Sequence, residues 1–247
     1  MEAALPLAWT FLLALLRTLA LVSVAPGISS KMVPARVKLG VSLAVALAGF
    51  SGANLAPIPL PDTMLALLAA GLRETMFGAL AGFGARMVLE AAAGAGHVAG
   101  LSMGLGYGSL INPDSGASSS VIADLFSTVS FTIAIALGMH REAFAWLCRS
   151  FTLLPPGSDL PLRALAAQAL FHTLFGITLA MRIAYPLLLA VTLGHVGLGL
   201  VGKFAQQLNL NTIGFSASLL AGGGALYLFA PQAMDLVARE TIRALPH

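Results

Sequence analysis

Seven charged side chains lie inside long apolar stretches of this chain, and their chemistry has to be explained first. A charged side chain at the centre of a membrane helix costs at least about 2.5–3.5 kcal/mol on insertion scales. Such a residue therefore faces a protein interior, a water-filled cavity or a partner. Two roles stay open, namely pairing between helices or subunits and direct participation in transport. The seven residues are Arg17, Arg73, Glu74, Arg86, Glu90, Arg182 and Lys203.

The spacing of these residues limits which of them can pair within one helix. Arg73 and Glu74 are adjacent, so they point in different directions and do not meet on one helical face. Arg86 and Glu90 are four residues apart and can pair on one face. The other cations have no acidic residue nearby, so they meet acids of other helices or subunits, or their helices lie near the membrane surface. These cations are Arg17, Arg182 and Lys203.

A polar, glycine-rich segment, residues 100–120, interrupts the apolar sequence. Glycines two residues apart, the Asn112-Pro113 step and a run of serines all disfavour a continuous helix. Non-helical backbone is tolerated at membrane depth only where it is buried in protein or lines an aqueous cavity. The segment therefore indicates a path through the protein.

The sequence lacks the patterns of common catalytic and metal sites. Gly214-Phe-Ser216 is followed by Ala217 and does not complete the G-x-S-x-G pattern of serine hydrolases. The glycines at 104, 106 and 108 lack the G-x-G-x-x-G spacing of nucleotide-binding loops. The histidines are dispersed, without an H-E-x-x-H motif or a cysteine pair. We expect no enzymatic activity, no cofactor and no metal. The five histidines are His97, His140, His172, His195 and His247.

The elements that must position these residues are apolar helices. Hydrophobic residues make up 58% of the 247 residues and charged residues only 9%, against about 25% in soluble domains. The net charge of +3 is too small to indicate a nucleic-acid partner. We expect an all-α, polytopic membrane protein with bent and broken helices and a single domain, residues 1–247. The expected helical stretches are residues 5–25, 39–61 ending in the rigid Pro57-Ile-Pro-Leu-Pro61, 64–93, 121–139, 143–154, 162–193 with a kink at Pro186, 196–210 and 212–237.

Short motifs occur in a fixed order along nearly the whole chain. They are Arg17 with Ala25-Pro26-Gly27 and Val33-Pro-Ala-Arg-Val-Lys-Leu-Gly40, Arg73-Glu74 with Gly78-Ala-Leu-Ala-Gly-Phe83, Ala95-Gly96, Met103-Gly-Leu-Gly-Tyr107 with Asn112-Pro-Asp-Ser-Gly116, Arg149-Ser-Phe-Thr-Leu-Leu-Pro155 with Gly157, and residues 203–214 with Gln206-Gln207-Leu-Asn209. In this order the chain resembles the FliR/SctT family of flagellar and type III secretion export proteins. It departs from the family pattern at Asn112, His97 and Gln206, where the family commonly has Asp, Glu or Gln, and Pro.

The resemblance implies a function as well as a fold. Family members assemble with FliP-like and FliQ-like subunits, and with FlhB-like and FlhA-like export proteins, into a helical export gate in the bacterial inner membrane at the flagellar basal body. That complex sits largely above the bilayer plane and passes unfolded protein substrates. A central loop plugs the closed channel. By motif position the plug residues here are Met103, Gly104, Gly106, Tyr107, Gly108, Ser109, Asn112, Pro113, Asp114, Ser115 and Gly116.

Alternatives to the flagellar export gate stay open. Residues 33–38 look closer to flagellar members, but the injectisome (SctT) branch is the nearest alternative. A different class is a polytopic small-molecule or ion transporter with Arg182 or Glu90 in its substrate site. An intramembrane hydrolase is a remote third option, because its motifs are missing.

Overall fold

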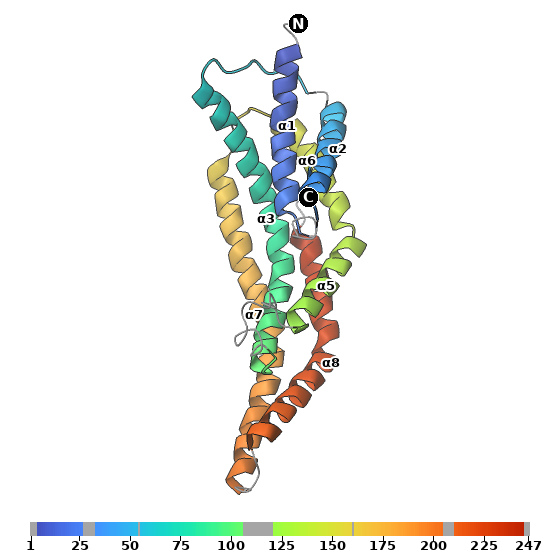
Figure 1. The fold of residues 1–247 in the computed structure, drawn as a ribbon, viewed down its shortest axis with the longest axis vertical. Coiled ribbons are helices and arrows are strands. Elements are labelled where there is room, and N and C mark those ends of the chain that lie inside the picture. The colour runs from blue at the N-terminus through green and yellow to red at the C-terminus, as the bar shows by residue number, and fades with distance from the viewer. Residues whose placement is uncertain are drawn as a thin grey trace. The chain divides into compact units, whose positions relative to one another are not determined.

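The structure is a computed structural model that describes residues 4–26, 33–53, 55–105, 121–159, 161–204 and 210–244. Within these ranges every regular element is a helix, which confirms the all-α prediction (Figure 1). The helices are α1 (Ala4–Val24), α2 (Ala35–Ala53), α3 (Met64–Ser102), α5 (Val121–Ala136), α6 (Met139–Leu153), α7 (Leu162–Phe204) and α8 (Leu210–Ala244).

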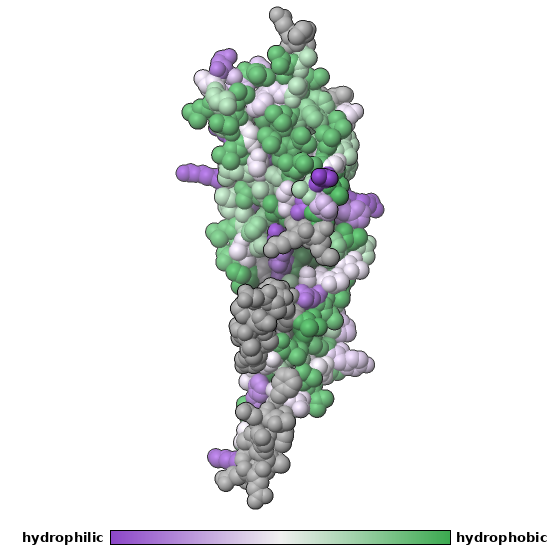
Figure 2. Space-filling model, in the orientation of Figure 1, coloured by the Kyte–Doolittle hydropathy of each residue, from purple (hydrophilic) through white to green (hydrophobic). Residues whose placement is uncertain are grey.

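Several helices are long and apolar enough to cross a membrane. By length and composition the candidate spans in the described residues are Ala4–Val24, Ala35–Ala53, Met64–Gly84 and Arg163–Leu200. The broken pair α5 and α6 adds a fifth if it counts as one span. Apolar side chains also dominate the molecular face drawn in Figure 2, where hydrophilic groups are isolated. The chain is therefore a polytopic membrane protein, as its composition predicts.

The chain divides into two compact units. Unit 1 comprises Met1–Met87, Ile135–Thr173 and Ile242–His247, and unit 2 comprises Val88–Ala134 and Leu174–Thr241. Helices α3 and α7 each contribute residues to both units. Because this division does not test whether the units fold independently, the single domain stays a prediction.

Unit 1 is built on a close crossing of α1 and α3. A Cβ atom placed at Gly78 would lie 2.1 Å from the Arg17 carbonyl oxygen, and one at Gly82 would lie 2.8 Å from the Leu21 carbonyl oxygen. Small residues four apart let two helix backbones approach in this way. Helix α2 packs against α1 and α6, and a core cluster of the unit is formed by Ala14, Leu21, Val22, Leu147 and Phe151.

An extended segment, residues 55–61, connects α2 to α3 in unit 1. Its three prolines cannot donate backbone hydrogen bonds and disfavour a helix, so the apolar stretch 39–61 ends in this rigid segment, and α2 itself ends at Ala53. The Ile58 amide donates to Thr10 Oγ1 on α1 at 2.9 Å. Helix α3 then begins after Thr63, whose Oγ1 accepts from the Ala66 amide at 3.3 Å.

Unit 2 packs the second part of α3 against α5, α7 and α8. Gly96 of α3 faces the backbone of Ala123, because a Cβ atom there would lie 2.8 Å from the Ala123 Cα. The end of α3 is fixed by two bonds, from Gly104 N to the Leu101 oxygen at 3.0 Å and from Leu105 N to the Gly100 oxygen at 2.9 Å. With Gly104 at φ 82°, this is a Schellman ending.

Helix α7 differs from its prediction at its second half. The sequence predicts a break at residues 194–195, but α7 continues from Leu162 through Pro186 to Phe204. A Cβ atom at Gly194 would lie 3.1 Å from Ala221 Cβ on α8, so this glycine serves helix packing and does not end the helix. Propensity alone favoured a break, and tertiary packing overrides it.

Candidate functional site

The centre of the candidate site is a cation buried in unit 1. Arg17 lies on α1 and has no solvent-exposed surface. Its guanidinium carbon lies 4.6 Å from the ring centroid of Phe77 on α3 and 5.2 Å from that of Phe151 on α6. The faces of these rings attract a cation, most strongly where water is excluded. Trp146 stacks on Phe77 at a centroid separation of 5.6 Å and extends this aromatic wall.

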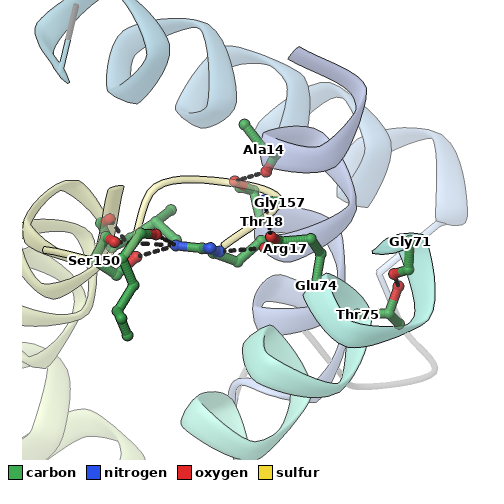
Figure 3. Close-up of polar contacts among 10 residues, drawn as sticks. Ala14, Arg17, Thr18, Gly71, Glu74, Thr75, Ser150 and Gly157 are labelled. Carbon is green, nitrogen blue, oxygen red and sulfur yellow. Dashed lines mark hydrogen bonds and ion pairs between the residues drawn. The ribbon is translucent and has the colours of Figure 1, made fainter. Parts of the chain in front are cut away.

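A carboxylate from a distant part of the sequence neutralises this cation. Arg17 Nε donates to Glu74 Oε2 on α3 at 2.7 Å, and the Glu74 side chain is only 1% exposed (Figure 3). Burying two charges is costly unless they pair and their remaining hydrogen-bonding atoms are satisfied. The rest of the site satisfies Arg17 Nη1 and Glu74 Oε1, whereas Arg17 Nη2 has no partner among the described residues.

The other side of the guanidinium binds the end of α6. Arg17 Nη1 donates to the carbonyl oxygens of Ser150 at 3.1 Å and of Leu154 at 2.9 Å, and lies 3.3 Å from Ser150 Oγ (Figure 3). The last carbonyls of a helix have no partner within the helix and carry partial negative charge. Helix α6 ends at Leu153, shortly before Pro155-Pro156, and the Ser150 oxygen also accepts from the Leu154 amide at 3.0 Å. A buried arginine that adds a donor to the Ser150 and Leu154 oxygens is therefore a suitable cap for this helix end.

The second carboxylate oxygen of Glu74 binds the linker between α6 and α7. The Gly157 amide donates to Glu74 Oε1 at 2.8 Å. Gly157 has φ 79°, a backbone conformation that L-residues other than glycine rarely adopt. We call Arg17, Glu74, Ser150, Leu154 and Gly157 the charge clasp. It joins α1, α3, the end of α6 and the following linker through one ion pair.

A second, exposed pair holds the same linker. Arg73 Nη1 donates to Asp159 Oδ1 at 2.8 Å, with side chains 49% and 98% exposed. Adjacent residues of α3 therefore bind different partners on one linker. Between them lies a small cavity of about 140 Å³, lined by Ala66, Ala69, Ala70, Arg73, Glu74, Gly157 and Ser158.

Among the buried side-chain atoms that the structure describes, Arg17 Nη2 has no hydrogen-bond partner. The other two guanidinium nitrogens hold Glu74 and the α6 carbonyls as fixed donors. The arrangement fastens helices and does not resemble an acid–base or nucleophilic site.

The other predicted charges lie elsewhere on the described chain. Arg86 is half-buried, whereas Glu90, Arg182 and Lys203 are exposed. Arg86 and Glu90 both have interaction partners, but their predicted pairing with each other stays a prediction. On this single chain only Arg17 and Glu74 of the predicted charges are buried.

The structure describes only the beginning of the predicted plug loop. Met103 is 2% exposed and packs against α8, where a Cβ atom at Gly222 would collide with its side chain. Gly104 follows in the Schellman ending of α3. The other predicted plug residues lie outside the described residues: Gly106, Tyr107, Gly108, Ser109, Asn112, Pro113, Asp114, Ser115 and Gly116.

One of the dispersed histidines lies in a contact between two helices, with a serine that the sequence did not single out. His195 Nε2 on α7 lies 2.5 Å from Ser218 Oγ on α8, and that hydroxyl donates to the Gly214 carbonyl at 2.7 Å. This is a polar contact between neighbouring helices, of the kind common in membrane proteins. Within the described ranges no group of three or more histidine, cysteine or acidic residues could hold a metal ion.

Comparison with known proteins assigns the family. A sequence profile described as "Bacterial export proteins, family 1" matches residues 8–244. The chain belongs to this family. It is 32% identical over 211 residues to the flagellar biosynthetic protein FliR of Escherichia coli, covering 84% of this chain and 79% of that protein. Flagellar biosynthetic protein FliR of Caulobacter vibrioides is 26% identical, covering 82% and 81%. Yop proteins translocation protein T of Yersinia pestis is 25% identical, covering 69% and 66%.

This membership confirms the resemblance that the motifs indicate, but it does not supply the geometry of the charge clasp. The sequence marks Arg17 and Glu74 as charges in apolar helices. It does not mark Ser150, Leu154 and Gly157 as their partners, because main-chain groups bind here and carry no side-chain signature. The available signal was the Pro155-Pro156 step. Prolines have no backbone N–H to donate, so carbonyls at the end of the preceding helix can accept from another donor, such as an arginine inside the protein.

Proposed function

We propose that this chain is a non-enzymatic subunit of the flagellar type III protein export gate, through which unfolded substrates leave the cytoplasm. The observation that carries the proposal is the family match across residues 8–244, together with flagellar relatives that align over most of their length. In this proposal the chain resides in the cytoplasmic membrane at the flagellar basal body. Its partners are FliP-like and FliQ-like subunits and, more peripherally, FlhB-like and FlhA-like proteins.

The lengths of three helices support an assembly of several subunits. Helices α3, α7 and α8 contain 39, 43 and 35 residues, whereas about 20 residues suffice to cross a bilayer. Exposed large hydrophobic side chains lie along α7 from Leu170 to Leu200, at both ends of α3, and in α8 between Leu219 and Phe229. One bilayer crossing cannot cover apolar surface of this length, and water would leave it unfavourably exposed. Neighbouring subunits that extend above the membrane would cover the remainder.

The charge clasp and the predicted plug loop have separate roles in this proposal. The clasp keeps α1, α3 and α6 together as a rigid support, because its ion pair is buried and bound to main-chain groups. The plug follows the fixed end of α3 at Gly104 and closes the channel until a substrate arrives. Export energy would come from other subunits, since the sequence has no nucleotide-binding motif.

The test is purification of the tagged full-length chain from its native membrane in mild detergent, followed by mass spectrometry of the bound proteins. We expect FliP-like and FliQ-like subunits in one large complex, and flagellar or injectisome partners would identify the branch. A tagged membrane protein of similar abundance serves as the control for nonspecific recovery. Recovery as a monomer or homodimer, with the neighbouring export genes expressed, would reject the gate and favour the small-molecule transporter.

A further inference from the structure

The outer face of α7 in unit 2 combines apolar side chains with one cation. Leu179, Ile183 and Leu187 are at most 2% exposed and pack into the unit 2 core. The opposite side is open, with Met181 55% exposed and Tyr185 65% exposed. Arg182 is exposed on this side and forms no ion pair with any residue that the structure describes. We call the exposed set the Arg182 face; it consists of Leu174, Met181, Arg182, Tyr185, Leu189 and Leu193.

The position of Arg182 along α7 leaves no placement in which lipid and water alone cover this face. Arg182 lies near the middle of the candidate span Arg163–Leu200, which has 38 residues. If the bilayer is centred on Arg182, its charge lies in hydrocarbon at a cost of about 2.5–3.5 kcal/mol or more. If Arg182 lies at the headgroup level, about half of the apolar face leaves the membrane. That half then needs protein to cover it.

A protein helix along this face would lower the cost in both placements, because it would pair Arg182 in the first and cover the apolar half in the second. We propose that the Arg182 face docks an apolar helix of another subunit that carries an aspartate or glutamate opposite Arg182. This inference rests on the proposed function, because it requires an assembly of several subunits. Charge complementarity selects the occupant, since a carboxylate would satisfy the guanidinium in a dehydrated contact.

A second copy of this chain is a poorer occupant. A symmetric dimer through this face would place Arg182 near its own equivalent, because twofold interfaces use the same patch on both subunits. Like charges in apolar contact are strongly unfavourable. A lipid phosphate could bind Arg182, but it would not cover the apolar residues that lie outside the bilayer.

Charge reversal of the full-length chain, expressed with its partner genes, tests the face. In Arg182→Glu we expect the fraction of membrane-bound chain recovered in the large complex to fall at least about tenfold, a change equivalent to about 1.4 kcal/mol. Arg182→Lys should retain most of the complex, because it keeps the charge. The matched control is Arg163→Glu, which makes the same change at an exposed residue near the start of α7. An Arg182→Glu chain that assembles like the wild type would overturn the proposal.

A photo-crosslinking amino acid in place of Tyr185, in a chain that keeps Arg182, tests the same face without charge reversal. We expect a cross-link to another export subunit, within about one helical turn of an acidic residue. Cross-links only to phospholipid, or only to a second copy of this chain, would reject the proposed occupant. If the wild-type chain forms no complex with export subunits, the proposed function itself fails. If the complex forms and these two results are negative, only the docking inference fails.

Discussion

At the scale of single residues, the charge clasp is a buried ion pair with main-chain support. Arg17 and Glu74 are 0% and 1% exposed, so their attraction must compensate for the loss of hydration. Bonds to the Ser150 and Leu154 carbonyls and from the Gly157 amide distribute both charges over three segments. Such a pair matters for stability mainly because both charges are present: removal of one partner leaves the other buried and uncompensated.

The clasp predicts a strong asymmetry between single and double substitutions. Glu74→Ala or Arg17→Ala should each destabilise the protein by about 3–5 kcal/mol, because one charge stays buried without its partner. The double variant should lose clearly less than the sum of the two, since it removes both charges. Thermal unfolding of the purified protein or complex, followed by tryptophan fluorescence, measures these differences.

The exposed pair on the neighbouring residue of α3 provides the control. Arg73→Ala should change stability by at most about 1 kcal/mol, because exposed ion pairs are screened by water and salt. Equal losses for Arg73→Ala and Glu74→Ala would contradict the assignment of the clasp as the stabilising centre. Additive effects of the two clasp substitutions would contradict it as well.

The sequence identified the charged members of the clasp but not their arrangement. Helical geometry shows that Arg73 and Glu74 diverge, and the structure gives them separate partners, Asp159 and Arg17. The partners themselves lie 86 and 57 residues away, so no local spacing rule reaches them. The crossing of α1 and α3 brings Arg17 to Glu74, and the packing of the linker after α6 on α3 brings Asp159 to Arg73.

At the scale of elements, unit 1 depends on how closely α1 approaches α3. Gly78 lies where a Cβ atom would be 2.1 Å from the Arg17 carbonyl oxygen, a backbone atom that cannot rotate away. The same residue of α1 carries the clasp guanidinium. The helix crossing and the ion pair are therefore coupled, because a change in helix separation displaces Arg17 relative to Glu74.

Gly78→Ala should separate the two helices and weaken the clasp. We expect a loss of about 1–3 kcal/mol or more, because overpacking against backbone forces a helix to shift. Gly40→Ala on α2 is the matched control, since no other atom lies within 4 Å of a Cβ atom there. Alanine favours a helix interior over glycine, so the control should be neutral or slightly stabilising. The unfolding temperatures of the two variants and the wild type are compared. If Gly78→Ala unfolds at the wild-type temperature, the close crossing of α1 and α3 is excluded.

Apolar patterning predicted where helices occur better than where they end. The alternating prolines of residues 57–61 marked the rigid end of the 39–61 stretch, but not that α2 itself ends at Ala53. The glycine at 194 suggested an end for α7 that the structure does not have, since Ala221 packs against it. A glycine in an apolar helix can serve either purpose, and only the neighbouring helix distinguishes them.

At the scale of the whole molecule, the family match agrees with the membrane character of the fold. The match extends over residues 8–244 and so includes both compact units. Long helices with exposed apolar sides are typical of a subunit that completes its surface in a complex. We therefore expect the isolated chain to aggregate more readily in solution than the chain in complex with its partner subunits.

Deletion of residues 106–116 tests the plug in the assembled gate. We expect the complex to form, because the described contacts of Met103 and Gly104 precede the deletion. We also expect the membrane to become leaky to ions and small dyes, which conductance or dye uptake would measure. In a control chain, a glycine-serine linker of equal length replaces the same residues. This control distinguishes the effect of a shorter loop from the effect of the lost side chains. Unchanged conductance in an assembled deletion complex would reject the plug.

The sequence separations within the charge clasp also constrain the order in which the helices can insert stably into the membrane during synthesis. Arg17 precedes Glu74 by 57 residues and the α6 carbonyls by more than 130, so its helix leaves the ribosome long before any of its partners exist. An unpaired arginine disfavours stable insertion of an isolated helix. We therefore expect α1 to settle in the membrane only once α3 has been synthesised. Nascent Glu74→Ala chains should consequently extract more readily from membranes at alkaline pH than wild-type chains of equal length.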